Sequence, residues 1–502
     1  MNIKELLKGT KIIGPIPSVD IKGINYDSRK VVPGDLFIAI KGISSDGHKY
    51  LKDVESRGAV AAVVEKTDKT TTIPQMVVEN SRDTLSLISN RWFGYPSNKM
   101  TLIGVTGTNG KTTTTYLLES IAKESGKKPG VIGTINYRYG GKVFPASHTT
   151  PESMDLQNLL KRMLDNGVDC VIMEVSSHAL ALKRVGGVDF DVAIFTNLTQ
   201  DHLDFHKNLE NYFESKALLF SSVIGDSKKK KKHSIINIDD PKGLELLKRS
   251  AVPTITFGIS KDSKHDISLK GFEFNHSGLK GNFKGKINGQ FHSSLVGMHN
   301  AYNILGAAAA AYAVDIDSKD ILKGISALKG VPGRLERVSR ENKKEPLVLV
   351  DYAHTDDALR NVLSAIQALP RSGRVITVFG CGGDRDPKKR PLMGKAAISS
   401  SDVVIVTSDN PRTENPLEII DQIIPGILET GAKKIPENKK NNGFIVEPDR
   451  RKAIHLAIDL ACADDIVLIA GKGHEDYQII GKEKIHFDDR EVAQEALDKK
   501  GL

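Results

Sequence analysis

Short apolar runs alternate with longer helix-like segments through most of this 502-residue chain. From about residue 100 onward, each apolar run is followed by polar residues and then by a segment with helical periodicity. This alternation predicts βαβ units, in which helices cover the faces of a parallel sheet. After the turn Val331–Arg334 the pattern begins again, and the predicted strands there are Leu347–Val350, Val375–Val378, Val403–Val406 and Ile466–Ile469.

The N-terminal region has shorter β-like segments than the rest of the chain. Asp35–Ile40 and Ala59–Val64 are predicted strands, and Arg82–Trp92 is a predicted helix. The turn-rich stretch Tyr95–Lys99 is typical of a linker. Because a chain of this length exceeds what one hydrophobic core can hold, we predict three domains, at residues 1–97, 98–331 and 332–502.

The strongest chemical signal lies between an apolar run ending at Val105 and a helix predicted over Tyr116–Lys123. The sequence there is T-G-T-N-G-K-T, in which glycines allow backbone N–H groups to approach phosphate oxygens. Lys111 adds a mobile cation, and Thr112 has a hydroxyl suited to Mg²⁺. Val105 stands where the common phosphate-loop pattern has its first glycine, so an ordinary glycine turn is the alternative. We predict an ATP-binding loop made of Gly107, Thr108, Asn109, Gly110, Lys111, Thr112 and Thr113.

Polar clusters follow the predicted strands directly. Val171–Glu174 ends in an acid, which could hold Mg²⁺ or could be a helix cap. Val192–Phe195 leads to a histidine-rich stretch that includes His202, where a packed polar turn is the alternative. Since parallel strands present their carboxyl ends at one sheet edge, such clusters predict a ligand site. The C-terminal region has four of them: Asp351–His354, Gly380–Arg385, Ser408–Arg412 and Gly471–Glu475.

Lys216 lies on the apolar stripe of a helix predicted over Leu209–Phe220, together with Phe213 and Ala217. A lysine at such a position usually extends its ammonium to water, and the spacing alone favours that interpretation. The alternative is a carbamylated lysine, whose carboxylate could bind a second Mg²⁺. Periodicity does not decide between them.

Composition limits the class of protein. The formal net charge is +9, yet aromatic residues make up only 6% and no nucleic-acid recognition module is apparent. A polyanionic small substrate therefore explains the charge as well as a nucleic acid does. The lysine run Lys228–Lys232 is expected to be a solvated loop. Without a signal peptide, a membrane-spanning run or metal-site cysteine spacing, we expect a cytoplasmic protein that binds neither membrane nor nucleic acid.

These motifs, in this order, resemble those of the Mur ligase family over essentially the whole chain. The resemblance rests on T-G-T-N-G-K-T at 106–112, T-T-P-E at 149–152, M-E-V-S-S-H-A-L at 173–180, T-N-L-T-Q-D-H-L-D-F-H at 196–206 and V-P-G-R at 331–334. It rests also on D-Y-A-H-T at 351–355, G-C-G-G-D-R-D at 380–386, D-N-P-R at 409–412 and G-K-G-H-E-D-Y-Q at 471–478. In the family, D-N-P-R together with G-K-G-H-E marks enzymes that add meso-diaminopimelate and not lysine.

The resemblance implies a three-domain α/β architecture. A small N-terminal domain would bind the UDP substrate, a central P-loop ATPase-like domain with a parallel sheet would bind ATP, and a C-terminal Rossmann-like domain would bind the amino acid. The implied reaction joins meso-2,6-diaminopimelate to UDP-N-acetylmuramoyl-L-alanyl-D-glutamate through an acyl phosphate, in peptidoglycan precursor synthesis. A monomer is expected, with ATP as co-substrate and two Mg²⁺ ions.

The resemblance also assigns site residues. Lys111, Glu174, His202 and Lys216 would be catalytic, and the metal ligands would be Thr112, Glu174, His202 and carbamylated Lys216. Asn300, Arg334 and Asp351 would contact ATP. The UDP-muramoyl-peptide would contact Ser28, Thr149, Thr150, Ser176 and Arg184, and diaminopimelate would contact Arg385, Asp409, Asn410, Arg412, Gly471 and Glu475.

Arginine forks explain the expected selectivity, because a guanidinium binds a carboxylate in bidentate fashion. Lysine lacks the distal carboxylate of diaminopimelate and would leave a buried arginine unpaired. Three positions depart from the family pattern: His148, Leu182 and Asp356. The alternatives are a lysine-adding ligase, a folylpolyglutamate synthetase, which has no use for the N-terminal module, or a nucleotide-binding switch protein, which does not need the C-terminal clusters.

Overall fold

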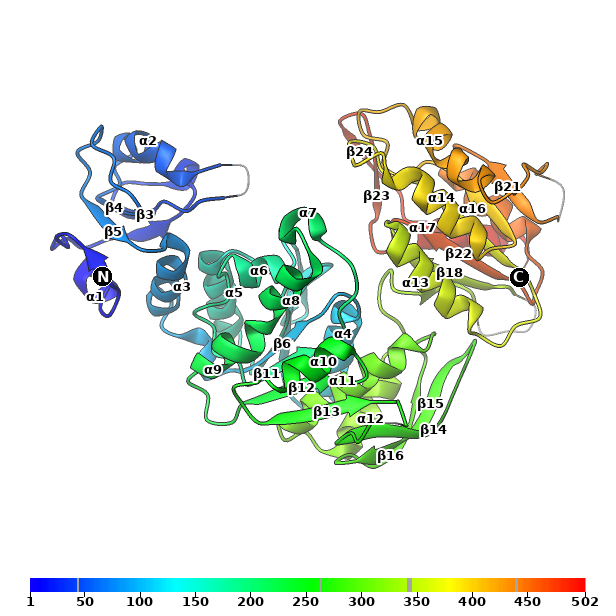
Figure 1. Ribbon diagram of the computed structural model, residues 1–502, viewed down its shortest axis with the longest axis horizontal. Coiled ribbons are helices and arrows are strands. Elements are labelled where there is room, and N and C mark those ends of the chain that lie inside the picture. Colours follow the sequence, from blue (N-terminus) through cyan, green and yellow to red (C-terminus); the bar gives the residue numbers. More distant parts are fainter. Residues whose placement is uncertain (43–44, 262, 341–344, 438–440, 502) are drawn as a thin grey trace. The chain divides into compact units, whose positions relative to one another are not determined.

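The computed structural model describes residues 1–42, 45–261, 263–340, 345–437 and 441–501 (Figure 1). The chain divides into two compact units, and each is described by itself. The first contains Met1–Ser268, Gly285–Ile287 and Leu305–Ile321, and the second contains Leu269–Lys284, Asn288–Ile304 and Leu322–Leu502. No helix within the described ranges is both long and apolar enough to cross a membrane.

A five-stranded sheet of order β1-β5-β4-β3-β2 forms the N-terminal part of the first unit. All neighbours pair in parallel except β1 with β5. Alternate residues of β3 enter different cores: Leu36 and Ile38 pack with helices α1 and α3, whereas Phe37 packs with α2. The elements are α1 (Ile3–Leu6), β1 (Ile12–Ile13), β2 (Gly23–Asn25), η1 (Ser28–Lys30), β3 (Asp35–Ile38), η2 (Gly47–Tyr50), α2 (Leu51–Ser56), β4 (Ala61–Val64), β5 (Gln75–Val78), α3 (Ser81–Trp92) and η3 (Pro96–Lys99).

The rest of the first unit is built on the parallel strands β13-β12-β11-β6-β10-β7, which β8 and β9 extend in antiparallel fashion. Helix α4 packs on β6, β7 and β10. The elements are β6 (Thr101–Thr106), α4 (Lys111–Glu124), β7 (Pro129–Ile132), β8 (Asn136–Tyr139), β9 (Lys142–Pro145), α5 (Ser153–Asp165), β10 (Cys170–Glu174), α6 (Ser177–Ala181), β11 (Val192–Phe195), α7 (Leu203–His206), α8 (Leu209–Ala217), the π-helical turn η4 (Leu219–Val223), α9 (Ile224–Asp226), β12 (His233–Asn237), α10 (Pro241–Leu247) and β13 (Thr254–Gly258).

The second unit contains the sheet β17-β18-β22-β19-β20-β21, which is parallel except at β17. Both faces are buried: Leu347 and Leu349 share a core with α13, α14 and α15, while Val348 and Val350 pack with α16 and α17. The elements are β17 (Glu336–Arg337), β18 (Leu347–Asp351), α13 (Asp356–Gln367), β19 (Val375–Phe379), α14 (Lys389–Ser399), β20 (Val403–Val406), α15 (Pro416–Leu428), β21 (Gly443–Val446), α16 (Arg450–Leu460), β22 (Ile466–Ala470), β23 (Tyr477–Ile480), β24 (Glu483–His486) and α17 (Asp489–Lys499).

Five further elements complete the chain: β14 (Ile267–Asn275), β15 (Gly278–Gly285), β16 (Gly289–Ser293), α11 (His299–Ala313) and α12 (Ser318–Ala327). The predicted α/β class is therefore confirmed, and the predicted strands form with ends shifted by at most a few residues. The lysine run is only partly the solvated loop expected from the sequence, because Lys229 folds back onto Asp191 at 3.0 Å and Lys232 donates to the carbonyls of Gly225 and Ser227.

The C-terminal sheet contains a fully buried ion pair between Arg450 and Asp489, whose Nη2 and Oδ2 atoms lie 2.6 Å apart. The guanidinium also donates to the carbonyl of Ala470, the last residue of β22, and to that of Ser408, two residues after the end of β20. One guanidinium thus joins the carboxyl ends of two strands.

Replacing Arg450 with Met should therefore lower the free energy of unfolding of this unit by about 3–5 kcal/mol, because Asp489 would be left buried without a cation. Urea denaturation followed by hydrogen exchange of the β20 and β22 amides measures the effect. Arg451→Met is the control, since the half-exposed Arg451 pairs with Glu495 at the surface and should change stability by less than about 0.5 kcal/mol. Equal effects of both variants would contradict the prediction.

Candidate functional site

The glycine-rich loop connects β6 to α4 as the sequence predicts. Gly107 and Gly110 have φ values of 147° and 86°, which are unfavourable for residues with a side chain. The loop is fixed by the segment that follows β11, because the Thr108 N–H donates to the carbonyl of Asn197 at 2.9 Å. In addition, the Thr196 hydroxyl donates to the carbonyl of Asn109 at 2.6 Å. The loop conformation therefore depends on β11 and the residues after it, as well as on its own glycines.

Two lysines converge on one carbonyl oxygen of this loop. The Nζ atoms of Lys111 and Lys216 each donate to the Gly107 carbonyl at 2.9 Å. Lys216 is only 1% exposed, so the expectation that its ammonium reaches water is wrong. Burial, and then the charge of Lys111, hold the pKa of Lys216 well below its usual value. The amine is accordingly disposed to be neutral, and a neutral amine is the form that can become a carbamate.

Thr112 and Glu174 lie together on the side of the loop toward β10. The Thr112 hydroxyl donates to Glu174 Oε1 at 3.0 Å, and the carboxylate is 1% exposed. Thr134 completes the arrangement, because its N–H and hydroxyl donate to the two Glu174 oxygens at 3.0 Å each. A buried hydroxyl and a buried carboxylate at this distance form a pair of oxygen ligands that fits Mg²⁺.

His202 stands in the loop before α7, with a positive φ of 54°. Its ring lies 4.9 Å from that of His178 and 6.0 Å from that of Tyr212. Tyr212 also has the Nζ of Lys216 over its ring, 4.3 Å from the centroid. The structure thus places His202 and Lys216 against the same aromatic ring.

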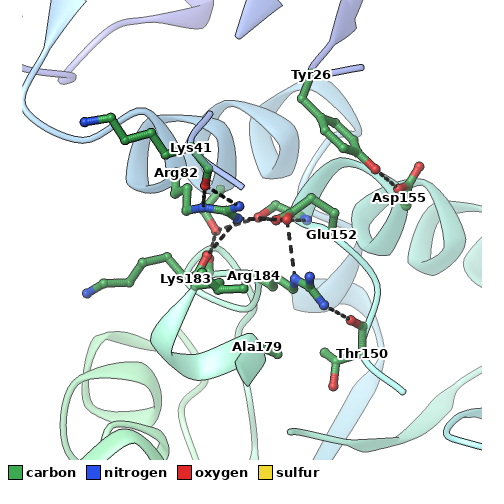
Figure 2. Close-up of polar contacts among 12 residues, drawn as sticks. Tyr26, Lys41, Arg82, Thr150, Glu152, Asp155, Ala179, Lys183 and Arg184 are labelled. Carbon is green, nitrogen blue, oxygen red and sulfur yellow. Dashed lines mark hydrogen bonds and ion pairs between the residues drawn. The ribbon is translucent and has the colours of Figure 1, made fainter. Parts of the chain in front are cut away.

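Four of the residues predicted to contact the muramoyl-peptide form a second cluster in the first unit, and Figure 2 shows two of them, Thr150 and Arg184. The Thr150 hydroxyl donates to the Glu174 carbonyl at 2.8 Å and accepts from the Ser176 N–H at 3.1 Å. Arg184 donates through Nη1 to the Thr150 carbonyl at 3.1 Å. The Thr149 hydroxyl lies 3.0 Å from that of Thr134, so this cluster continues into the Glu174 site.

Ser28, the remaining member of that predicted set, is buried in the turn η1. Nearby Tyr26 hydrogen-bonds through its hydroxyl to Asp155 on α5, and burial followed by this bond raises the pKa of Tyr26. Tyr26 and Asp155 also belong to the lining of a cavity of about 350 Å³ that includes His148 and Arg162. His148, one of the departures from the family pattern, is therefore part of the wall of this cavity.

Three predicted nucleotide contacts belong to the second unit. Asp351 is buried at the end of β18 and accepts from the N–H groups of Leu335 and Ala353 at 2.7 and 2.9 Å. Burial raises the pKa of its carboxyl group, and the charge of Arg334 opposes that shift. Asn300 donates to the Val296 carbonyl and accepts from Asn303. The Nε of Arg334 is buried without a hydrogen-bond partner among the described residues.

A second site in this unit is built from Asn410 and Glu475, at the ends of β20 and β22. Asn410 Nδ2 donates to Glu475 Oε2 at 3.1 Å. The fully buried Lys472 lies between the acids, with Nζ 3.6 Å from Asp409 Oδ1 and 3.7 Å from Glu475 Oε2. Gly471 is close to the same group, since a Cβ built on it would lie 3.9 Å from Asp409 Oδ2.

The side chains of Arg412 and Arg385 both approach Gly382. A Cβ at Gly382 would lie 3.0 Å from Arg412 Nη1 and 3.8 Å from Arg385 Cγ. Arg412 donates to the Gly383 carbonyl at 2.6 Å and has a positive φ of 50°. Its backbone is held by β23, because its N–H donates to the Ile479 carbonyl. The Asn410 carbonyl lies 3.8 Å from the same Cβ position, so the two arginine side chains and the Asn410–Glu475 pair all lie around the loop at Gly382. Such a set of groups can bind a ligand that carries both an anionic and a cationic group.

Sequence patterns missed several residues that support these sites. Thr134, Tyr212 and Lys472 contact the predicted residues directly. Arg82 and Glu152 contact Arg184 or its partners. Glu152 closes the T-T-P-E motif, and Lys472 lies inside G-K-G-H-E, so both were within quoted motifs without an assigned role. No spacing signal identifies Arg82, Thr134 or Tyr212.

Family models cover most of the chain. Residues 105–311 match the Mur ligase middle domain, residues 333–473 match the Mur ligase glutamate ligase domain, and residues 20–93 match the model described as Mur ligase family, catalytic domain.

Curated relatives match this chain over nearly the full length of both sequences. It is 46% identical over 482 residues to the UDP-N-acetylmuramoyl-L-alanyl-D-glutamate–2,6-diaminopimelate ligase of Geobacter sulfurreducens, covering 94% of both chains. It is 43% identical to the Clostridium tetani protein of the same name, covering 99% of this chain and 100% of the relative.

Solved structures have the same fold. A structure titled as the diaminopimelate ligase has a TM-score of 0.72 at 31% identity and covers 100% of this chain and 99% of its own. A Mycobacterium tuberculosis folylpolyglutamate synthase, complexed with ADP and AMPPCP, has a TM-score of 0.60 at 18% identity and covers 78% of this chain and 92% of its own. The second likeness shows the fold alone.

Gly107→Ala should abolish nucleotide binding. The added Cβ would lie 1.9 Å from the Thr196 hydroxyl, and the φ of 147° disfavours any side chain. The expected result is loss of the rise in melting temperature that ATP produces in the unchanged protein. Gly330→Ala is the control, because it meets no atom within 4 Å; a retained ATP effect in Gly107→Ala would refute the assignment of the loop.

Proposed function

The chain belongs to the Mur ligase family, and on that premise we propose that it joins meso-2,6-diaminopimelate to UDP-N-acetylmuramoyl-L-alanyl-D-glutamate at the expense of ATP. This places it in peptidoglycan precursor synthesis. The observation that carries the choice of amino acid is the approach of Arg412 and Arg385 to Gly382, next to the backbone of Asn410, whose side chain pairs with Glu475. A nucleotide switch protein would need no such cluster.

The reaction has two steps. A carboxylate oxygen of the D-glutamyl residue attacks the γ-phosphorus of ATP, which forms an acyl phosphate and releases ADP. The amino group of diaminopimelate then attacks the acyl carbon, so that the C–O bond to phosphate breaks, an amide forms and phosphate leaves with the bonding electrons. Lys111 would lie along the phosphates and neutralise the charge of the transferring group.

Two Mg²⁺ ions are part of this proposal. The buried Thr112–Glu174 pair fits one of them, and His202 with carbamylated Lys216 would hold the other. Bound there, the ions would supply charge neutralisation for the phosphates. The shared Gly107 carbonyl supports carbamylation, because two ammonium groups this close in a buried site repel each other. A carbamate on Lys216 replaces that repulsion with attraction to Lys111.

The amino acid would bind in the second unit. Arg412 and Arg385 would receive the distal carboxylate, and Glu475 with Asn410 would receive the distal ammonium, with Asp409 and Gly471 shaping the site. Asn300, Arg334 and Asp351 would contact ATP. The buried Nε of Arg334, which lacks a hydrogen-bond partner among the described residues, supports a role in binding an anion.

The UDP-muramoyl-peptide would extend from Ser28 to Thr149, Thr150, Ser176 and Arg184 in the first unit. We propose the domain boundaries 1–97, 98–331 and 332–502, which agree with the gaps between the family models. We also propose a cytoplasmic monomer, consistent with three cysteines that are all free thiols.

Arg412 should be the selector of the amino acid. With ATP, Mg²⁺ and UDP-muramoyl-dipeptide, phosphate release should require meso-diaminopimelate and be negligible with L-lysine. Arg412→Ala should lower kcat/KM for diaminopimelate by about 10³-fold or more, because the distal carboxylate loses its charged partner. Arg360→Ala, an exposed position on α13, is the control. Equal use of lysine by the unchanged protein would favour the lysine-adding alternative, and release that ignores the amino acid would favour a nucleotide switch.

Carbamylation of Lys216 can be tested by chemical rescue. Lys216→Ala should be inactive and should regain part of its activity with formate or acetate, whose carboxylate can occupy the vacated space. Formate and acetate should not restore the activity of Lys111→Ala, because that variant has lost a positively charged group and these anions replace a negatively charged one. Because burial lowers the pKa of Lys216 and so raises the neutral fraction of its amine, ¹³C-bicarbonate should give a carbamate signal in wild type that is absent in Lys216→Ala and declines as the pH falls. Formate rescue of both variants, or of neither, would count against carbamylation.

A further inference from the structure

Arg82, on the first turn of α3, uses its guanidinium to join three segments that are far apart in the sequence (Figure 2). Its Nε and Nη2 donate to the Lys41 carbonyl at 3.1 and 2.9 Å. Its Nη1 donates to Glu152 Oε2 at 2.8 Å and to the Leu182 carbonyl at 3.4 Å. A rigid planar fork is needed for this pattern, and a lysine ammonium could not reproduce it.

Glu152 is shared between two guanidiniums. Its Oε2 lies 2.8 Å from Arg82 Nη1 and 3.3 Å from Arg184 Nε. The side chains of Arg82, Glu152 and Arg184 are 12%, 10% and 16% exposed, so water screens the group weakly. One carboxylate between two guanidiniums leaves one net positive charge.

That surplus charge is associated with Arg184. The Nη1 of Arg184 donates to the Thr150 carbonyl. Its Nε lies close to Glu152 but does not have the geometry of a hydrogen bond. Within the described part of the chain, its Nη2 makes no hydrogen bond to protein. Arg184 is therefore held in place on one side and retains donors for an anionic ligand on the other.

We propose that Arg82 is a positioning residue for the nucleotide-sugar substrate: through Glu152 it fixes the guanidinium of Arg184, and through the Lys41 carbonyl it ties the N-terminal sheet to that same group. The inference rests on the proposed function and goes beyond it, because Arg82 touches no substrate itself. The ligand that this arrangement recognises is the anionic part of the UDP-muramoyl-peptide, whose carboxylates and phosphates match the surplus charge. Leu182 contributes its backbone carbonyl to this group, so the contact with Arg82 does not depend on the side chain at that position.

A double-mutant cycle tests the coupling. Dissociation constants for UDP-muramoyl-dipeptide are measured by calorimetry, and KM and kcat by phosphate release, for wild type, Arg82→Met, Arg184→Met and the double variant. Arg82→Met should weaken binding and raise the KM for this substrate by about 10- to 100-fold. The KM values for ATP and diaminopimelate should stay within about twofold. On the Arg184→Met background, Arg82→Met should add less than about threefold, because it acts through a guanidinium already removed.

Two further variants separate positioning from stability. Arg82→Lys should rescue little of the affinity, since an ammonium cannot reach all three acceptors. Arg91→Met, on the same helix, removes a guanidinium that donates to the carbonyls of Glu5 and Leu6, and should leave substrate binding unchanged.

Additive effects in the cycle, or an equal loss of affinity in Arg91→Met, would overturn the inference. A wild-type protein that binds UDP-muramoyl-dipeptide but forms no product with diaminopimelate would overturn the proposed function alone. In that case the calorimetric cycle would still decide the role of Arg82.

Discussion

The geometry of the phosphate-loop site depends on the hydrogen bonds that the Gly107 carbonyl accepts. One oxygen accepts hydrogen bonds from Lys111 and Lys216, which come from different helices, and the loop around it is fixed by residues after β11. Two cations in a buried space are unfavourable unless one is neutralised. Burial, and then the nearby charge of Lys111, lower the pKa of Lys216 and dispose this lysine to lose its positive charge. The phosphate loop and the site around Lys216 therefore share the Gly107 carbonyl as a common hydrogen-bond acceptor.

The carboxyl ends of parallel strands provide the framework for both sites. In the first unit, β6 leads to the phosphate loop, β10 ends in Glu174 and β11 leads to Thr196. In the second unit, β18 ends at Asp351, while β20 and β22 lead to Asn410 and Glu475. Because these strands are in parallel register, polar residues far apart in sequence reach a common sheet edge. Arg450, which is paired with the buried Asp489, donates hydrogen bonds near the ends of two of these strands. The same interaction therefore contributes to the stability of the sheet and to the position of the residues that follow those strands.

Much of the fold could be predicted from local pattern. Apolar runs such as Val403–Val406 became strands with the expected bounds, because a continuous β-branched run suits a sheet buried on both faces. Helix starts were less accurate: α4 begins at Lys111, five residues before the predicted start, because its first turn is a polar Thr-rich segment without hydrophobic periodicity. The expectation that the Lys216 ammonium reaches water was the clearest error, since periodicity gives the face of a helix but does not say whether water reaches that face.

The sequence by itself determined the class of the fold, the phosphate loop and the motifs that identify the family, because glycine conformations, strand-end polarity and apolar periodicity are local properties. The tertiary structure alone decided the burial of Lys216, the support of Glu174 by Thr134, and the Arg82–Glu152–Arg184 group. Each of these joins residues separated by tens of positions, and each depends on exclusion of water by packing. The spacing of residues along the chain gives no information about these long-range contacts or about burial, since both arise only when the sheets and helices pack together.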